Sequence, residues 1–226
     1  MNKNLKNITN NGEQESGFSK LEKYKEEGYL FHGSPKSNLK KIEPNESGHG
    51  NNYVYAVSEP VFAAMFSLKN RGNTLVAMWR RNSEGVPCLY ERKEGIFDTL
   101  FEGQESSIYV VEKKNFFQEK GMWASEYVSK KEEVVVDEVH IEDVREFLLE
   151  LEKYKEFQLI KYEDREKYFP NIEEDEIKDT HALIKKYGGQ KTLELLEKWR
   201  PDLIDKVSWF ETNREATSEL NKRNSI

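Results

Sequence analysis

The sequence predicts an α+β fold, with a sheet-rich domain followed by a helical C-terminal region. Between residues 29 and 141, short runs of β-branched and aromatic residues alternate with Gly, Asp, Asn and Ser, which is typical of strands joined by turns. After Glu142, apolar residues recur at spacings of three and four, which indicates amphipathic helices. We therefore expect a flexible tail over 1–18, a sheet domain over 19–141 and a helical region over 142–226.

The sheet domain begins with a short helix over 19–27, which Gly28 ends, and a strand then runs into His32. Tyr53–Val57 forms a second strand by its aromatic and β-branched content. A helix follows, because Ser58 is a candidate N-cap and Pro60 suits the first turn. Further strands are predicted over 74–79, 87–91, 108–112, 126–129 and 134–141.

The C-terminal region contains four predicted helices. The first carries an apolar stripe from Val144 to Tyr154. The second runs from the acidic residues after Asn171 to the Gly188-Gly189 pair, which is a good helix stop. The remaining helices are expected over 192–199 and from Leu203 to about residue 220.

Charge and composition limit the classes of function. The chain has 226 residues, of which 36% are hydrophobic and 34% charged, with a formal net charge of −7. That charge argues against a general affinity for nucleic-acid backbone or anionic membrane, although local basic patches remain open. No apolar run reaches the ~18 residues of a membrane span, and the N-terminus does not read as a secretory signal. Cys88 is the single cysteine, which excludes an internal disulfide and suits a reducing, cytoplasmic compartment.

Several familiar active sites have no motif support. The sequence has no Walker loop, no Gly-x-Gly-x-x-Gly after a strand and no Gly-x-Ser-x-Gly elbow. The four histidines, His32, His49, His140 and His181, have no metal-ligand spacing, so no metal is expected. His140 and His181 are interpreted as structural, whereas His49 stands between two glycines in a loop.

Three places remain as candidates for chemistry: His32-Gly33-Ser34 at a strand end, Tyr55 before a helix, and Glu126 at the opening of a strand. Taken singly, each has an ordinary structural explanation. A strand-end His-Gly can be a turn, a strand tyrosine can be core, and a strand-opening glutamate can be solvated.

The order and context of these residues resemble the His-Tyr-Glu type of the ADP-ribosyltransferase superfamily, which includes the poly(ADP-ribose) polymerases and diphtheria-like toxins. The resemblance covers about residues 29–141, half of the chain. It rests on Phe31-His32-Gly33-Ser34, on Val54-Tyr55-Ala56, on Glu126-Tyr127-Val128, and on Phe66, the second aromatic, eleven residues after Tyr55. The resemblance implies a split, mostly antiparallel sheet.

It further implies a mono-ADP-ribosyltransferase-like enzyme with NAD as co-substrate. Glu126, His32 and Tyr55 would be catalytic, and His32, Gly33, Ser34, Tyr55 and Phe66 would bind the cofactor. Tyr55 and Phe66 could stack on nicotinamide. Glu126 could stabilise the oxocarbenium-like charge at the ribose. The acceptor is unknown and could be protein or nucleic acid.

Several features separate this chain from the family pattern, and two of them concern the candidate site directly. Phe66 lacks the hydroxyl of a second tyrosine, and only 23 residues separate His32 from Tyr55, so a donor-binding loop would be short. The alternative function is a catalytically inactive nucleotide-binding or protein-interaction module on the same fold.

The tail carries large apolar residues in a polar segment: Trp199, Leu203, Trp209 and Phe210. They either pack on the sheet domain or form an exposed patch for a homo-oligomer or partner protein.

Overall fold

The computed structural model describes residues 17–46, 52–68 and 77–207, and it has an α+β fold with a mostly antiparallel sheet. The chain divides into two compact units. Unit 1 comprises Met1–Ser67 and Ser106–Ile141, and unit 2 comprises Leu68–Glu105 and Glu142–Ile226. Residues 68–105, which we expected inside the 19–141 domain, therefore belong with the C-terminal region.

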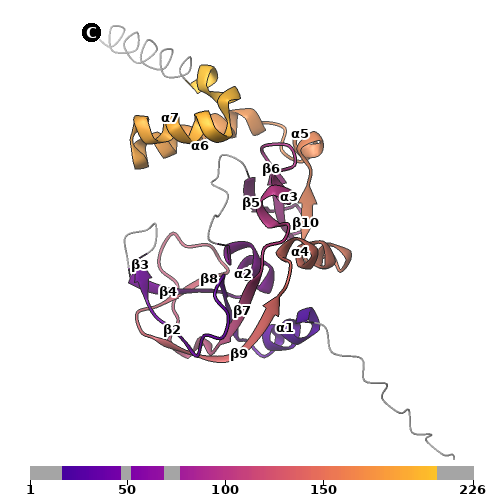
Figure 1. Cartoon of the computed structure of the whole chain (residues 1–226), viewed down its shortest axis with the longest axis vertical. Helices are drawn as coiled ribbons and strands as arrows, with labels where there is room; N and C mark the ends of the chain where they lie inside the picture. Colours follow the sequence, from indigo (N-terminus) through magenta and orange to yellow (C-terminus); the bar gives the residue numbers. More distant parts are fainter. Residues whose placement is uncertain (1–16, 47–51, 69–76, 208–226) are drawn as a thin grey trace, which may run out of the picture. The chain divides into compact units, whose positions relative to one another are not determined.

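Unit 1 is built on a seven-stranded sheet with the order β2-β9-β7-β1-β4-β3, in which β8 also pairs with β4 (Figure 1). Every pairing in it is antiparallel. Its elements are α1 (Gly17–Glu26), β1 (Leu30–Ser34), β2 (Lys41–Ile42), β3 (Asn45–Glu46), β4 (Asn52–Val57), α2 (Pro60–Phe66), β7 (Ser106–Val111), η1 (Lys113–Asn115), β8 (Glu126–Ser129) and β9 (Glu133–Ile141).

The two faces of this sheet are covered differently. Helix α2 packs against β1, with contacts to β4 and β7 as well. The opposite face carries a compact apolar cluster, because alternate residues of a strand point to the same side. That cluster consists of Leu30, Ile42, Val54, Ala56, Tyr109, Val111 and Phe116, with Tyr127 packed against it.

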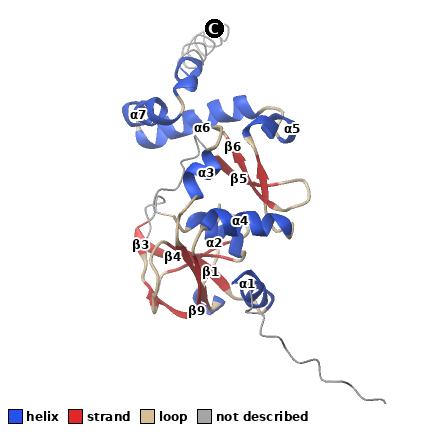
Figure 2. Ribbon diagram, turned by 45° about the vertical axis from the view of Figure 1, so that its right-hand side comes forward, coloured by secondary structure: helices blue, strands red, loops and turns tan. Residues whose placement is uncertain are grey.

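Unit 2 has a three-stranded sheet with the order β10-β6-β5, and Figure 2 labels β5 and β6 of this sheet. Strand β6 pairs antiparallel with β5 and parallel with β10, although about seventy residues separate β6 from β10. This long-range pairing is the reason that 68–105 joins the C-terminal unit. The elements are β5 (Ala77–Arg81), β6 (Pro87–Glu91), α3 (Ile96–Phe101), α4 (Val144–Lys153), β10 (Gln158–Ile160), η2 (Tyr162–Asp164), α5 (Arg165–Tyr168), α6 (Ile172–Tyr187), α7 (Gly189–Trp199) and η3 (Pro201–Leu203).

A buried ionic network ties α6 to the rest of unit 2. The side chains of Arg92, Glu176 and Arg200 are 0%, 3% and 4% exposed. Arg200 donates to Glu176 at 2.8 Å, and Arg92 donates to Asp179. Buried charges of both signs must compensate one another, because an unpaired charge in an apolar interior is costly.

Most predicted elements are confirmed, with specific differences. The N-cap position of the helix after β4 is Glu59 rather than Ser58, and the Glu59 side chain makes no capping hydrogen bond. Helix α4 begins as predicted, and the Asp143 carboxylate accepts from the N–H of Glu146. Helix α3 and strand β10 were not predicted. Trp209 and Phe210 lie outside the described residues, while Leu203 is buried.

Cys88 is fully buried in β6, and burial raises the pKa of its thiol to about 11. In the part of the chain that the structure describes, no helix combines the length and the apolar character needed to cross a bilayer.

Candidate functional site

The three sequence-predicted residues lie on three neighbouring strands of unit 1. Strand β4 stands between β1 and β8, and Figure 1 shows α2 following β4 directly. Phe31 of β1 is opposite Val57 of β4, and Val57 is opposite Glu126 of β8. Phe31, Val57 and Glu126 thus form a row across three strands. His32 is one residue from this row along β1, and Tyr55 is two residues from it along β4.

A direct hydrogen bond joins His32 to the strand that carries Tyr55. The Nδ1 atom of His32 is 2.7 Å from the main-chain oxygen of Tyr55. A carbonyl oxygen can only accept, so Nδ1 carries the proton of this bond. In the neutral ring, Nε2 is then an acceptor, which fixes the tautomer that a ligand would meet.

The His32 bond spans a place where two strands separate. All five residues of β1 pair with β7, and four residues of β4 pair with β8. Between the described residues of β1 and β4, by contrast, the register contains one pair, Phe31 with Val57. The sheet is therefore open beyond Phe31, at the end of β1 that carries His32.

The strand register assigns the three side chains to two faces. Tyr55, Val57 and Glu126 share the face that α2 covers, because Val57 is paired with both Phe31 and Glu126 and residues two apart point to one side. His32 leaves β1 on the opposite face, where its ring centroid is 6.5 Å from that of Tyr109. The structure thus brings His32 to the main chain of Tyr55, whereas His32 and Glu126 point to different faces.

Phe66 belongs to an aromatic group on the α2 face. Its ring is stacked with Phe62 at 6.3 Å between centroids, and both rings lie beside Trp123, at 5.6 and 5.9 Å. Trp123 is 46% exposed. Its carbonyl accepts from the N–H of Glu126 at 3.0 Å, so Trp123 stands one turn before the carboxylate.

Trp123 was missed in the sequence, where the available signal was a tryptophan three residues before Glu126 in a short polar loop. A second aromatic group, also missed, surrounds Tyr55. The Tyr53 ring lies 6.1 Å from both Tyr55 and Phe117. Phe117 pairs with Val128 of β8, and the Tyr53 hydroxyl donates to Glu119 at 2.6 Å.

Gly33 and Ser34 have structural roles in the turn after His32. A Cβ at Gly33 would lie 1.9 Å from the carbonyl oxygen of Ala63 in α2, so only glycine allows this approach. Ser34 is buried, and its hydroxyl accepts from the N–H of Lys36 at 3.2 Å. The cofactor-binding roles of both residues stay predictions.

The other histidines lie elsewhere. His140 is exposed on β9, where its Nδ1 is 3.5 Å from the hydroxyl of Ser107. His181 is partly buried in α6 of unit 2. His49 is outside the described residues.

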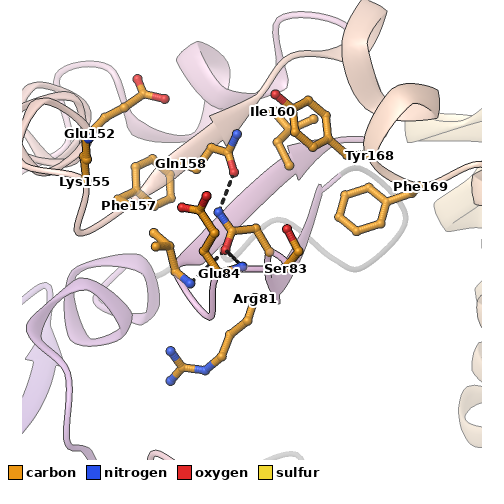
Figure 3. Close-up of a pocket in the computed structure, with 12 residues that line it drawn as sticks. Arg81, Ser83, Glu84, Glu152, Lys155, Phe157, Gln158, Ile160, Tyr168 and Phe169 are labelled. Carbon is orange, nitrogen blue, oxygen red and sulfur yellow. Dashed lines mark hydrogen bonds between the residues drawn. The ribbon is translucent and has the colours of Figure 1, made fainter.

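Unit 2 contains a hollow of about 510 Å³ beside the turn between β5 and β6 (Figure 3). The side-chain oxygen of Asn82 accepts from the N–H groups of Glu84 and Val86, and its amide donates to Gln158. The lining carries charges of both signs and none of the predicted site residues: Arg81, Asn82, Ser83, Glu84, Val86, Glu152, Lys155, Phe157, Gln158, Ile160, Tyr168 and Phe169. We assign no ligand chemistry to it.

Comparison of the chain with protein-family models, with curated proteins and with solved structures returned no match.

Proposed function

We propose that the chain is a mono-ADP-ribosyltransferase-like enzyme that uses NAD as co-substrate and acts through the open end of β1 and β4 in unit 1. The bond from His32 to the Tyr55 carbonyl carries the proposal, since it links two of the three key residues across the point where the strands separate. Glu126, on the next strand, completes the set.

The surroundings of Glu126 suit a flat, cationic leaving ring. Tyr55 and Phe66, both partly exposed, present aromatic faces on the same side of the sheet as the carboxylate. Aromatic rings favour stacked or edge-to-face partners at centroid distances of roughly 4.5–7 Å. Tyr55 and Phe66 would therefore hold nicotinamide, with Trp123 beside them.

The remaining predicted residues would hold the donor at the open end. In the tautomer fixed by Tyr55, the Nε2 of His32 would accept a hydrogen bond from a ribose hydroxyl. Gly33 and Ser34 would contribute the main chain after His32.

The chemistry assigned to the chain is a group transfer at the anomeric carbon of the ribose. The glycosidic bond to nicotinamide breaks, and nicotinamide leaves with the bonding electron pair. The acceptor nucleophile forms a bond to the same carbon and loses its proton. Glu126 would stabilise the oxocarbenium-like charge and orient the nucleophile.

Glu126→Gln is the decisive variant, because it keeps the shape of the side chain and removes the charge. Wild type should release nicotinamide from NAD and transfer label to an acceptor in cell lysate. We expect the Gln variant to lose roughly 10²- to 10⁴-fold in rate. Glu112→Gln is the matched control, since that exposed carboxylate is ion-paired with Lys114 and has no role assigned in the transfer, and its rate should be unchanged. If the Glu126 variant matches wild type, the assigned role is wrong.

The alternative is a catalytically inactive nucleotide-binding or protein-interaction module on the same fold. One observation favours it: His32 and Glu126 point to different faces of the sheet, whereas the transfer needs both beside one ribose. Calorimetric titration with NAD separates the candidates. Binding without nicotinamide release would support a nucleotide-binding module, and absence of binding would refute both NAD-dependent functions.

A further inference from the structure

Strand β8, which Glu126 opens, has hydrogen-bonding partners along both of its edges. On one edge it pairs with β4, and the carbonyl of Ser125 accepts from the N–H of Ser58 at 2.9 Å. On the outer edge, which faces away from β4, Val128 and Phe117 exchange both of their main-chain hydrogen bonds, each at 2.9 Å. Residues two apart in an antiparallel strand direct their main-chain groups to the same edge, so those of Glu126 also face outward.

The outer pairing does not continue from Val128 to Glu126. The register of Phe117 with Val128 would place Glu119 opposite Glu126. Instead, the N–H of Glu119 lies 3.4 Å from the sulfur of Met122, and its carbonyl accepts from the N–H of Met122 at 3.2 Å. The chain therefore turns at Glu119, and the described residues supply no strand opposite Glu126 on this edge.

The side chain of Gln118 takes the place of that strand. Its Nε2 donates to the main-chain oxygen of Ala124 at 2.7 Å and to that of Glu126 at 3.3 Å. Both partners are carbonyl oxygens, which only accept, so the amide nitrogen is the atom that faces them. The N–H of Glu126 donates to the carbonyl of Trp123 at 3.0 Å. Both main-chain groups of Glu126 are therefore bonded to the loop that precedes it.

The direction of the Glu126 carboxylate depends on these bonds, because its side chain starts from the main chain that they orient. A shift of about 1 Å at a reacting group can cost about 100-fold in rate. Trp123, whose carbonyl takes part, has its ring beside Phe62 and Phe66. The hydrogen bonds of Gln118 therefore hold the loop that carries both Trp123 and the candidate carboxylate.

We propose that Gln118 is a positioning residue for the transfer, which fixes the start of β8 so that Glu126 meets the anomeric carbon of the ribose. The hold on the main chain stands on the hydrogen bonds alone, while the effect on the reaction rests on the proposed function. No contact with NAD is assigned to Gln118.

Gln118→Glu tests this role, because it keeps the size of the side chain and replaces the donating amide by a carboxylate. At neutral pH, oxygens of like partial charge would face the carbonyls of Ala124 and Glu126. A glutamic acid with an ordinary pKa of about 4.3 donates through its O–H once protonated, and two facing carbonyl oxygens raise that pKa. The substitution thus removes the bond at neutral pH and restores part of it in acid.

The kinetic test is nicotinamide release from NAD by the full chain. We expect Gln118→Glu to lower kcat roughly 10- to 100-fold at neutral pH, with KM for NAD unchanged within about twofold, because Glu126 is assigned to the transition state. The ratio of wild-type to variant kcat should decrease at least about threefold on going to about pH 5. Forming the ratio cancels the titration of Glu126, which both proteins share.

The chain offers a matched control on α7. Gln190 is exposed, and its Nε2 donates to the Glu194 carboxylate at 3.3 Å, so Gln190→Glu also replaces an amide donor by a carboxylate. This control should keep the kcat and KM of wild type at both pH values. Circular dichroism measures the folded fraction of each protein.

Amide hydrogen exchange, followed by NMR, measures the hold on the main chain without any reaction. In the Gln118 variant at neutral pH, the amide of Glu126 should exchange roughly 5- to 10-fold faster, the effect of one lost hydrogen bond. The amide of Val128, which is bonded to the main chain of Phe117, should change less.

The outcomes separate this inference from the proposed function. A lower kcat that recovers in acid, with faster exchange at Glu126, supports the positioning role. Equal kcat in wild type and variant overturns it and leaves the proposed function intact, as does a loss of kcat that only follows a loss of folded protein. No nicotinamide release by wild type refutes the proposed function and with it the role in transfer. Unchanged exchange at Glu126 overturns the inference whatever the kinetics.

Discussion

The contact between Gly33 and α2 gives the sharpest test of the arrangement of unit 1. Gly33→Ala adds one methyl group, and it would lie 1.9 Å from the Ala63 carbonyl oxygen, 2.8 Å from the Ala63 carbonyl carbon and 3.0 Å from the Ser67 Cβ. The first two atoms are main chain. Rotation of a side chain cannot relieve these close contacts, so α2 must move away from β1.

The size of the effect follows from this geometry. Extra methyl groups in a packed interior cost typically 1–3 kcal/mol, occasionally more. A non-bonded carbon–oxygen contact needs more than about 3 Å, so the helix must shift by about 1 Å and disturb its buried face. We therefore expect a loss of about 3 kcal/mol in the free energy of unfolding. In a chain of this length, that corresponds to a decrease in Tm of roughly 6–12 °C.

Urea and thermal unfolding, followed by circular dichroism, measure this loss. Gly189→Ala is the control, because no heavy atom of the described residues lies within 4 Å of its Cβ position and it opens α7. It should be neutral or stabilise by up to about 1 kcal/mol. A Gly33 variant within about 0.5 kcal/mol of wild type, the ordinary scatter of surface substitutions, would refute the packing of α2 on β1.

Three further predictions concern unit 2. Cys88, whose pKa is raised to about 11 by burial, should not react with a thiol reagent at neutral pH until the protein is unfolded in urea, and rapid native labelling would contradict the buried position. Glu176→Ala leaves two buried arginines without their shared partner and should cost about 3–5 kcal/mol in urea unfolding, whereas Glu174→Ala, on the exposed face of the same helix, should cost under about 0.5 kcal/mol. The Arg200 guanidinium lowers the pKa of Asp202, so the carboxylate contributes stability above the unfolded pKa of about 4 that is lost as the pH falls through the folded value. The difference in unfolding free energy between wild type and Asp202→Asn should therefore be constant near neutral pH and decrease in acid. A difference that increases in acid would show that the pKa of Asp202 is shifted in the opposite direction.

The local elements could be predicted from the sequence because their signals are local. Strand β8 was predicted with its full bounds, since aromatic and β-branched residues follow Glu126 directly. Helix α4 has an apolar stripe of the right period and an aspartate at its start. The content of unit 2 could not be predicted, because β6 joins β10 across a long sequence separation and no property of either strand encodes its partner.

The candidate site was predictable only in part for the same reason. His32, Tyr55 and Glu126 could be selected from their sequence contexts. The face of the sheet on which each side chain lies depends on the register of β4 with β1 and β8. Trp123 became visible only when the loop before β8 was seen beside α2. The separation of β1 from β4 after Phe31 likewise has no sequence signal. The residues of β4 that no longer pair with β1 are still typical strand residues.

His32 and Gly33 differ as evidence for a ligand site. Gly33 is required by the approach of the Ala63 carbonyl whether or not a ligand binds, so its presence is no argument for a nucleotide site. His32 is held differently, because its ring is partly exposed and its bond to the Tyr55 carbonyl joins two strands beyond their last paired residues. His32→Asn separates these roles, since an asparagine amide can replace the Nδ1 donor but supplies no group at the position of Nε2. If the variant keeps wild-type stability but loses NAD turnover, Nε2 contacts the ligand. If it loses stability alone, the role of His32 is to join β1 to β4 by a hydrogen bond, which favours the inactive module.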